Sequence, residues 1–333
     1  MNILLTGGNG FIGRALYPGL MEKEHTVTCM IRKPGTHSSD PERLFNKVVY
    51  FDNLNEETEF KVIMSGIDVV VHLAARAHML LKSEYDMQKE FMDINFLGTR
   101  NLAEQAAEQG VKRFVFISSI GVNGKSTKDR GPYTEQDIEK PYNSYTTSKL
   151  FAEKALRKIE AETGMEVVII RPPLVYGPHV KANFLKLLNL VHSGAPLPLA
   201  RVNNQRSFIS INNLVDAICE CAVHPAAAGE TFLVSDGPPL STTRLLEKIF
   251  EAFDRPPKLF FFPEKIFKIG LMLMRKKNIY DRLWGSLAVD SSWIGKRIGW
   301  QPEQTFEQEI KRTVQWYLKG YLKEKDPAHD SSR

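Results

Sequence analysis

The stretch LLTGGNGFIGRAL, residues 4–16, decides how the chain folds, because it joins an apolar run to a helical pattern through three glycines. Gly7, Gly10 and Gly13 have the spacing G-x-x-G-x-x-G. Glycines at these points let a pyrophosphate approach the amides at a helix N-terminus, and let the helix pack closely on the strand. Between a strand and a helix the triplet predicts a dinucleotide site; the alternative is a tight turn without a ligand.

Apolar runs alternate with helical patterns through the first half of the chain. We expect helices at 10–23, 86–109 and 144–163, the last two ending at Gly110 and Gly164. We expect strands at 2–6, 26–31, 47–51, 67–75, 113–119 and 166–170. Continuous apolar strands alternating with helices are typical of a parallel sheet covered on both faces. The sequence therefore predicts an α/β fold with a Rossmann-type sheet.

The character of the sequence changes after Arg171, where prolines cluster in RPPLVYGP and GAPLPLA. We expect a dinucleotide-binding domain at 1–170 and a smaller substrate lobe at 171–320, with segments of the lobe able to return to the sheet. One more strand is predicted at 230–236 and a last helix near 303–319. The polar tail 321–333 is predicted to be disordered.

The composition limits the classes of function. The 333 residues include 44 basic and 39 acidic residues, a formal net charge of +5, without the basic stripe and interleaved aromatics typical of nucleic-acid binding. We therefore expect no nucleic-acid partner. Cys29, Cys219 and Cys221 fit no zinc pattern, so we expect no metal site, and Cys29 is expected to be a buried small hydrophobe. A reducing compartment and a cytoplasmic location are expected, since MNILLTGGNG is no signal peptide.

The stretch nearest to a membrane-spanning run is IFKIGLMLMRKK, Ile266–Lys277, which Lys268 interrupts. It is too short and too charged to span a membrane. The favoured interpretation is a helix of the substrate lobe packed on the core. The less favoured interpretation is a patch that contacts a membrane surface.

Two segments carry candidate catalytic residues. In NSYTTSKLFAEKAL, Tyr145 and Lys149 are four residues apart and would share a helix face. The lysine ammonium would lower the phenol pKa, so that Tyr145 can protonate a carbonyl oxygen while hydride arrives at its carbon. FISSIGVNG ends a strand with Ser118 and Ser119; Ser119 is our choice to hydrogen-bond the same oxygen, and Ser118 the near alternative.

Together these segments resemble the extended short-chain dehydrogenases/reductases of the NAD(P)-dependent nucleotide-sugar epimerase/dehydratase family. The resemblance runs from residue 1 to about 320. It rests on TGGNGFIG (6–13), DVVVHLAA (68–75), NFLGTRNL (95–102), FVFISSIGVNG (114–124), YTTSK (145–149), RPPLVYGP (171–178) and RSFISINNLVDAI (206–218).

The resemblance implies a role for individual residues. Ser119, Tyr145 and Lys149 would be the catalytic triad. Asp52 would lie near the adenine and Asn95 beneath the nicotinamide. The remaining cofactor contacts would come from Gly7, Gly10, Phe11, Ile12, Gly13, Leu73, Ala74, Ala75, Pro172, Tyr145 and Lys149.

For the sugar nucleotide, the resemblance implies contacts from Ser119, Asn183, Arg201 and Arg206, with the guanidinium of Arg206 on phosphate. Exposed, solvated charges are the alternative for the two arginines. The 4,6-dehydratases of the family carry an Asp-Glu pair directly after the catalytic hydroxyl residue. Here Ile120 and Gly121 stand there, and neither can move a proton, so dehydration is set aside.

The end of the second strand bears on the cofactor. Members that bind NAD present a carboxylate to the adenosine ribose there, whereas this chain has Ile31, Arg32 and Lys33. Two cations without an acid favour the 2′-phosphate of NADP(H), with NAD(H) still able to bind; a solvated loop is the alternative. An exchanging, reduced cofactor suits a ketoreductase better than an epimerase.

The leading hypothesis is therefore an NADPH-dependent 4-keto reductase of a UDP-4-keto-6-deoxy-HexNAc. The second lobe resembles bacterial enzymes that form UDP-N-acetylquinovosamine for surface polysaccharides. The first alternative is a UDP-hexose or UDP-HexNAc 4-epimerase; an alternative of another class is a non-catalytic NADP-binding regulator. The resemblance also implies a homodimer through the helices at 86–109 and 144–163.

Overall fold

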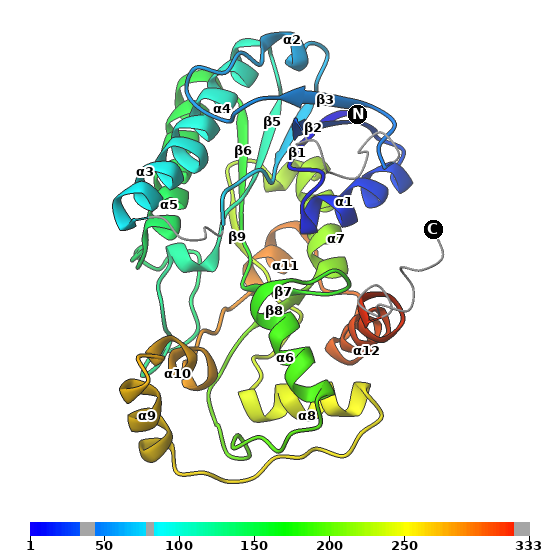
Figure 1. Cartoon of the computed structure of the whole chain (residues 1–333). Coiled ribbons are helices and arrows are strands. Elements are labelled where there is room, and N and C mark those ends of the chain that lie inside the picture. Colours follow the sequence, from blue (N-terminus) through cyan, green and yellow to red (C-terminus); the bar gives the residue numbers. More distant parts are fainter. Residues whose placement is uncertain (34–43, 78–82, 323–333) are drawn as a thin grey trace.

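Seven parallel strands form the central sheet of the protein, which a computed structural model describes for residues 1–33, 44–77 and 83–322. Their order across the sheet is β3-β2-β1-β4-β5-β6-β9 (Figure 1). The chain order changes direction at β1, which has β2 on one side and β4 on the other. The strands are β1 (Asn2–Thr6), β2 (Thr26–Arg32), β3 (Val48–Phe51), β4 (Val69–His72), β5 (Arg113–Ile117), β6 (Glu166–Arg171) and β9 (Thr231–Leu233). The predicted Rossmann-type α/β fold is confirmed.

Both faces of the sheet are buried, because successive side chains of each apolar strand point to opposite sides. Leu5 and Cys29 belong to the core on one face, and Leu4 and Met30 to the core on the other. Figure 1 looks along the sheet, with α4 and α5 on one side of it and α1 and α7 on the other. The bounds of the covering helices are α1 (Phe11–Glu22), α2 (Lys61–Met64), α4 (Gly98–Glu108), α5 (Ser144–Thr163) and α7 (Ile211–Val223).

The long helix predicted at 86–109 is interrupted. The chain forms α3 (Glu84–Phe91), then a π-helical turn at Met92–Leu97, then α4. The wider turn carries the buried Asn95, and such turns inside helices often occur at functional sites. By contrast, α5 has the predicted bounds, with a capping box at Asn143 and a left-handed Gly164 at φ 76° as its C-terminal cap.

A second group of elements packs around its own core, in which Tyr176, Phe184 and Phe250 are buried. Its strands β7 (Leu174–Tyr176) and β8 (Phe208–Ser210) form a separate parallel pair. The helices of this part are α6 (Ala182–His192), α8 (Thr242–Ala252), α9 (Glu264–Leu273), α10 (Lys277–Trp284), α11 (Ser292–Ile298) and α12 (Phe306–Trp316). Of these, α11 packs against the core of the main sheet through Ile294 and Ile298.

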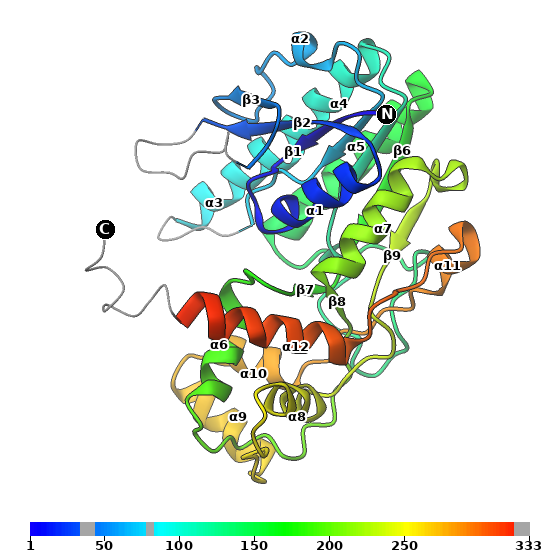
Figure 2. The ribbon, with the colours of Figure 1, turned by 90° about the vertical axis from the view of Figure 1, so that its right-hand side faces the viewer.

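The division of the chain near residue 170 stays a prediction. The elements after that point do not all lie in the second group, since β9 extends the main sheet beside β6 and α7 covers one of its faces (Figure 2). Of the tail predicted at 321–333, only residues 321 and 322 lie within the described residues. All three cysteines are buried and free, which confirms the interpretation of Cys29. Among the residues that the structure describes, no helix is long and apolar enough to cross a membrane.

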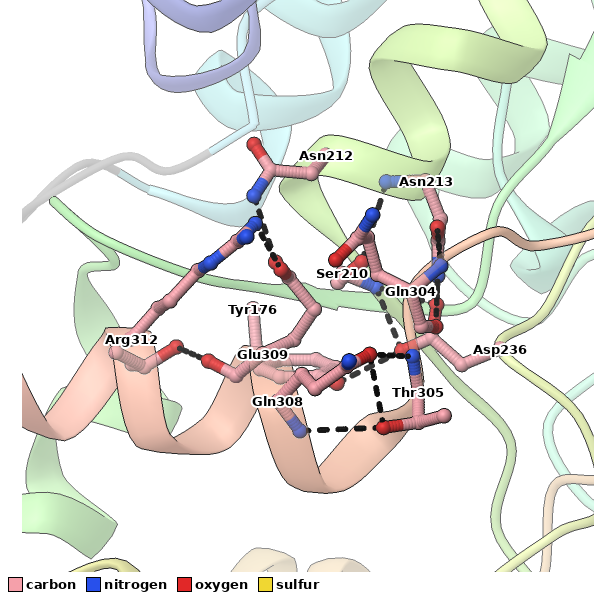
Figure 3. A network of polar contacts seen from close by, with 11 residues as sticks. Tyr176, Ser210, Asn212, Asn213, Asp236, Gln304, Thr305, Gln308, Glu309 and Arg312 are labelled. Carbon is pink, nitrogen blue, oxygen red and sulfur yellow. Dashed lines mark hydrogen bonds and ion pairs between the residues drawn. The ribbon is translucent and has the colours of Figure 1, made fainter.

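A buried polar network joins β7, β8 and α7 to the start of α12 (Figure 3). The carboxylate of Asp236 accepts from the Tyr176 hydroxyl at 2.8 Å, from the Ser210 amide at 2.9 Å and from the Asn213 side chain at 2.7 Å. Asn213 exchanges two further hydrogen bonds with the backbone of Gln304. Burial raises the pKa of Asp236, although these donors oppose that shift.

We expect Asp236→Ala to lower the free energy of unfolding by about 2–4 kcal/mol, because it leaves the buried donors of Tyr176, Ser210 and Asn213 without their shared acceptor. The urea midpoint measures this loss. Glu303→Ala removes an exposed carboxylate from the segment just before α12 and serves as the control. Equal midpoints for the two variants would show that the network does not stabilise the fold.

Candidate active site

The turn between β1 and α1 has the geometry of an anion cradle. Gly7 has φ 71°, and a Cβ atom on it would lie 2.8 Å from the amide nitrogen of Ala74. A Cβ on Gly13 would overlap the carbonyl oxygen of Gly7. The N-cap residue of α1 is Gly10, which has no side chain to cap the helix, and the first turn holds no acidic residue. Its leading amides and its dipole therefore suit the diphosphate of a dinucleotide.

A cavity of about 220 Å³ opens beside this turn. It brings together six of the predicted cofactor-binding residues: Gly7, Gly10, Arg32, Leu73, Ala74 and Ala75. The sequence reasoning missed the rest of its lining: Asn9, Phe51, Asn53, Leu54, Arg76 and Ile94. Phe11 and Ile12 instead pack their side chains on the two neighbouring cores. These last two residues can therefore face a ligand at the turn with their backbone amides.

Arg32 and Lys33, the two cations predicted to meet the cofactor at the end of β2, have different surroundings. Arg32 lines the cavity, whereas Lys33 forms an ion pair with Asp52, 2.9 Å from Nζ to Oδ1. Both members of this pair are exposed and neither is among the lining residues of the cavity. Arg32 is thus the member of the pair that could meet a phosphate in the cavity.

Tyr145 and Lys149 lie on the first two turns of α5, as predicted. The ring of Tyr145 meets the ring of Phe91 edge to face at 5.9 Å. Nζ of Lys149 is buried, donates to the carbonyl oxygen of Ile117 at 2.8 Å and lies 4.4 Å from the centre of the Phe116 ring. Burial lowers the pKa of Lys149 to about 7 and raises the pKa of Tyr145 to about 12.

The direction of the Tyr145 shift is opposite to our expectation from the sequence. We expected the Lys149 ammonium to lower the phenol pKa, but loss of solvation dominates both groups. The ammonium of Lys149 donates to the carbonyl of Ile117 at the end of β5, and Lys149 is not among the groups that shift the pKa of Tyr145. At neutral pH Tyr145 is therefore protonated, which suits a proton donor.

The two serines after β5 differ in their environment. Oγ of Ser119 is half-buried and accepts from the Gly121 amide at 3.1 Å, so its own O–H remains available as a donor. Oγ of Ser118 is buried without a hydrogen-bond partner among the described residues. Pro172 fixes the turn after Ser119, because its carbonyl oxygen accepts from the Ile120 amide at 3.0 Å.

Asn95 connects the cavity to the helix that carries Tyr145. Its amide nitrogen donates to the Arg76 carbonyl at 3.0 Å and to Ser148 Oγ at 3.1 Å, and its oxygen accepts from the Arg76 amide at 2.7 Å. Ser148 in turn donates to the carbonyl oxygen of Tyr145 at 2.7 Å. Asn95 thereby fixes the loop after β4 relative to the first turn of α5, a positioning role that Ser148 shares.

His72 is a buried polar residue that the sequence reasoning missed. Its Nδ1 lies 2.7 Å from Oγ1 of Thr6 and its Nε2 lies 2.9 Å from Oγ1 of Thr99. Burial, with a contribution from Lys149, lowers the pKa of His72 to about 3, so the ring is neutral. Thr6 also accepts from the Ala74 amide at 3.1 Å. The network therefore holds the loop that lines the cavity.

Of the predicted substrate-binding residues of the second lobe, Arg206 and Asn183 are linked through a shared neighbour, whereas Arg201 lies apart. Arg206 donates to the carbonyl oxygen of Gly285 at 3.0 Å, and Asn183 accepts from Nη1 of Arg282 at 2.8 Å. Arg206 also donates to the Arg282 carbonyl at 3.3 Å, so Arg282 of α10, which the sequence reasoning missed, links the two. Burial lowers the pKa of Arg206. Arg201 is exposed, with its guanidinium 5.1 Å from the Phe261 ring, and it lines a separate cavity of about 460 Å³.

The fold and these residues place the chain in a class of protein. It belongs to the NAD dependent epimerase/dehydratase family, whose sequence model matches residues 3–235. The resemblance to extended short-chain dehydrogenases/reductases is thus confirmed.

The chain is also similar to individual proteins of known sequence or structure. A UDP-glucose 4-epimerase of Vibrio cholerae is 42% identical over 321 residues, which cover 96% of both chains. The crystal structure of a UDP-glucose 4-epimerase of Thermotoga maritima with UDP-glucose matches with a TM-score of 0.72 at 22% identity, over 96% of this chain and 100% of that chain. A UDP-glucuronic acid 4-epimerase of Bacillus cereus in complex with NAD matches with a TM-score of 0.76 at 18% identity, over 98% and 99%. The two structures support the fold alone.

Proposed function

We propose that this protein is a 4-epimerase of a UDP-hexose or UDP-HexNAc. The observation that carries this proposal is the 42% identity, along 96% of both chains, to the Vibrio cholerae UDP-glucose 4-epimerase. It outweighs the sequence argument for a reductase, which rested on two cations at the end of β2 and on the resemblance of the second lobe to UDP-N-acetylquinovosamine-forming enzymes. One of them, Lys33, pairs with Asp52. That Tyr145 and Lys149 are both present favours an enzyme over a non-catalytic regulator.

The chemistry assigned to the chain centres on the 4-oxygen of the sugar. A bound nicotinamide cofactor would supply the hydride acceptor and donor for C4. As hydride leaves C4, the 4-hydroxyl gives its proton to the phenolate of Tyr145, and as hydride returns Tyr145 gives that proton back to the 4-oxygen. Ser119 donates a hydrogen bond to the same atom. The positive charge of an oxidised nicotinamide would favour the phenolate that the first of these steps needs. Lys149 donates to the carbonyl oxygen of Ile117 and so fixes α5 relative to the end of β5. Arg206, Arg282 and Asn183 form a polar cluster suited to a sugar nucleotide, where two guanidinium groups favour its diphosphate.

The second candidate is an NADPH-dependent 4-keto reductase of a UDP-4-keto-6-deoxy-HexNAc that serves polysaccharide biosynthesis. Arg32 favours it, because this side chain lines the cavity beside the glycine turn and β2 offers no carboxylate to repel a 2′-phosphate. NADP(H) is therefore the proposed preference, with NAD(H) also accepted.

We expect Arg32→Glu to weaken NADPH binding at least about tenfold, and NADH binding much less, because only the former carries a phosphate for the guanidinium to contact. Isothermal titration calorimetry with NADPH and with NADH measures the two dissociation constants. Lys47→Glu places the same charge change on an exposed residue just before β3 and is the control. Equal loss for the two cofactors would remove the basis for the NADP(H) preference.

One pair of reactions separates the two candidates. The purified protein is incubated with UDP-glucose and, in parallel, with UDP-N-acetylglucosamine, each once with catalytic NAD and once with catalytic NADP. The products are resolved by proton NMR. A separate tube contains UDP-4-keto-6-deoxy-HexNAc and NADPH, and its absorbance at the nicotinamide band is followed. Formation of the galacto epimer from UDP-glucose or UDP-N-acetylglucosamine supports the epimerase. Stoichiometric loss of NADPH in the separate tube, with no epimer formed from either of the first two substrates, supports the reductase.

We further propose a homodimer that pairs the segments 86–109 and 144–163 of two copies. Phe151 of α5 is exposed and its ring lies 5.6 Å from that of Phe96 in the π-helical turn, so an apolar surface is available there. Light scattering of the purified protein tests this assembly, and a monomeric mass would contradict it.

A further inference from the structure

The surface of α9 is apolar on the side that faces away from the protein. None of the residues of α9 is buried. Its inner contact is Phe267, whose ring lies 4.8 Å from that of Trp284. Figures 1 and 2 show α9 at the end of the molecule opposite α2.

Large apolar side chains cover this outer side. Ile266, Ile269 and Leu273 follow the spacing of one helix face and are 58%, 59% and 81% exposed. Exposed methionines of the last turn and the C-cap extend the surface, which we define as the α9 patch: Ile266, Ile269, Met272, Leu273 and Met274. Apolar residues are normally scattered singly on the surface of a monomer, so a contiguous group indicates a partner.

The segment that carries the patch is strongly basic. Between residues 258 and 277 it holds one acidic residue, Glu264, and six basic ones: Lys258, Lys265, Lys268, Arg275, Lys276 and Lys277. The net formal charge of this segment is therefore +5, which equals that of the whole chain. Among the described residues, none forms an ion pair with Lys265, Lys268, Arg275 or Lys276, all of which are exposed. These charges are therefore available to an anionic partner.

We propose that the α9 patch docks on the surface of an anionic lipid bilayer. An exposed helix with apolar residues on its outer side and basic residues around them matches the pattern of helices that lie in the membrane interface. The apolar side chains would enter the acyl boundary, and the lysines and arginines would meet anionic headgroups. A second copy of the chain fits less well, since pairing the patches would bring together two segments that each carry +5.

The proposal goes beyond the proposed enzyme activity and does not depend on it. The test is flotation of the full-length protein with vesicles of 3:1 phosphatidylethanolamine and phosphatidylglycerol, and with vesicles of phosphatidylcholine alone. We expect recovery with the anionic vesicles only, falling as NaCl is raised, because salt screens the attraction. The double variant Ile269→Glu/Leu273→Glu should reduce the bound fraction at least about tenfold, and Arg275→Gln/Lys276→Gln should reduce it severalfold.

The matched control is Val62→Glu/Ile138→Glu, which adds the same two charges at residues that are 92% and 78% exposed outside the patch. This variant should float like the wild type. Thermal melting of every variant establishes that it is folded. Absence of flotation of the wild type, or equal loss in the control, would overturn the proposal. So would a self-associated form that the α9 variants dissociate in the absence of any vesicle binding.

Discussion

Tyr145→Phe is expected to lower kcat about 10²–10⁴-fold, the usual contribution of a positioned general acid or base. The substitution removes one hydroxyl and keeps the ring, so the edge-to-face contact with Phe91 persists. The hydroxyl, whose pKa burial raises to about 12, is the only group of the ring that can take the proton of the 4-hydroxyl and return it. Cofactor binding and thermal stability should therefore stay close to those of the wild type.

The kinetic comparison needs a tyrosine whose hydroxyl has no assigned role. Tyr85 of α3 is 76% exposed, and Tyr85→Phe should leave kcat unchanged. Initial rates and cofactor titrations on both variants separate a loss of chemistry from a loss of binding. If Tyr145→Phe retained more than about a tenth of the wild-type kcat, proton exchange by this residue would no longer explain the activity.

Gly13→Ala is expected to abolish measurable cofactor binding and to destabilise the protein by several kcal/mol. A Cβ atom there would overlap the carbonyl oxygen of Gly7 and the Cα atom of Gly8, both of which are backbone atoms that no side-chain rotation can move away. The turn must therefore open, and the leading amides of α1 then leave the geometry that a diphosphate requires.

The control for this variant is Gly131→Ala, where a Cβ would find open space. Thermal melting with and without NADH or NADPH measures both effects: the control should keep the wild-type melting temperature and its increase on adding cofactor. A Gly13→Ala protein that kept that increase would show that the cofactor does not depend on this turn.

The sheet and its covering helices could be predicted because their signals are local. The short apolar run NILLT, followed at once by glycines, indicates a buried strand, and Gly164 readily takes the left-handed conformation that ends α5. The ends of strands were predicted less well. The run at 67–75 is almost wholly apolar, yet β4 ends at His72, and Leu73, Ala74 and Ala75 leave the sheet to line the cavity.

Contacts between distant segments account for what the sequence reasoning missed. Arg282 lies 99 residues beyond Asn183, and only the packing of α10 brings the two side chains together. His72 looked like one more residue of an apolar strand, because its two threonine partners are 66 and 27 residues away. The raised pKa of Tyr145 likewise depends on burial, which the i,i+4 spacing to Lys149 does not reveal.

The central claim is that the hydrogen removed from C4 of the sugar returns to C4 of the same molecule. Deuterium placed at C4 of UDP-glucose tests it, with catalytic NAD in one sample and catalytic NADP in another, and NMR detection of the product. The proposal predicts UDP-galactose that retains the label at C4. A failure to form UDP-galactose, or a product whose C4 deuterium has been lost, would contradict it for this substrate, and the same experiment with labelled UDP-N-acetylglucosamine decides between the two sugar classes.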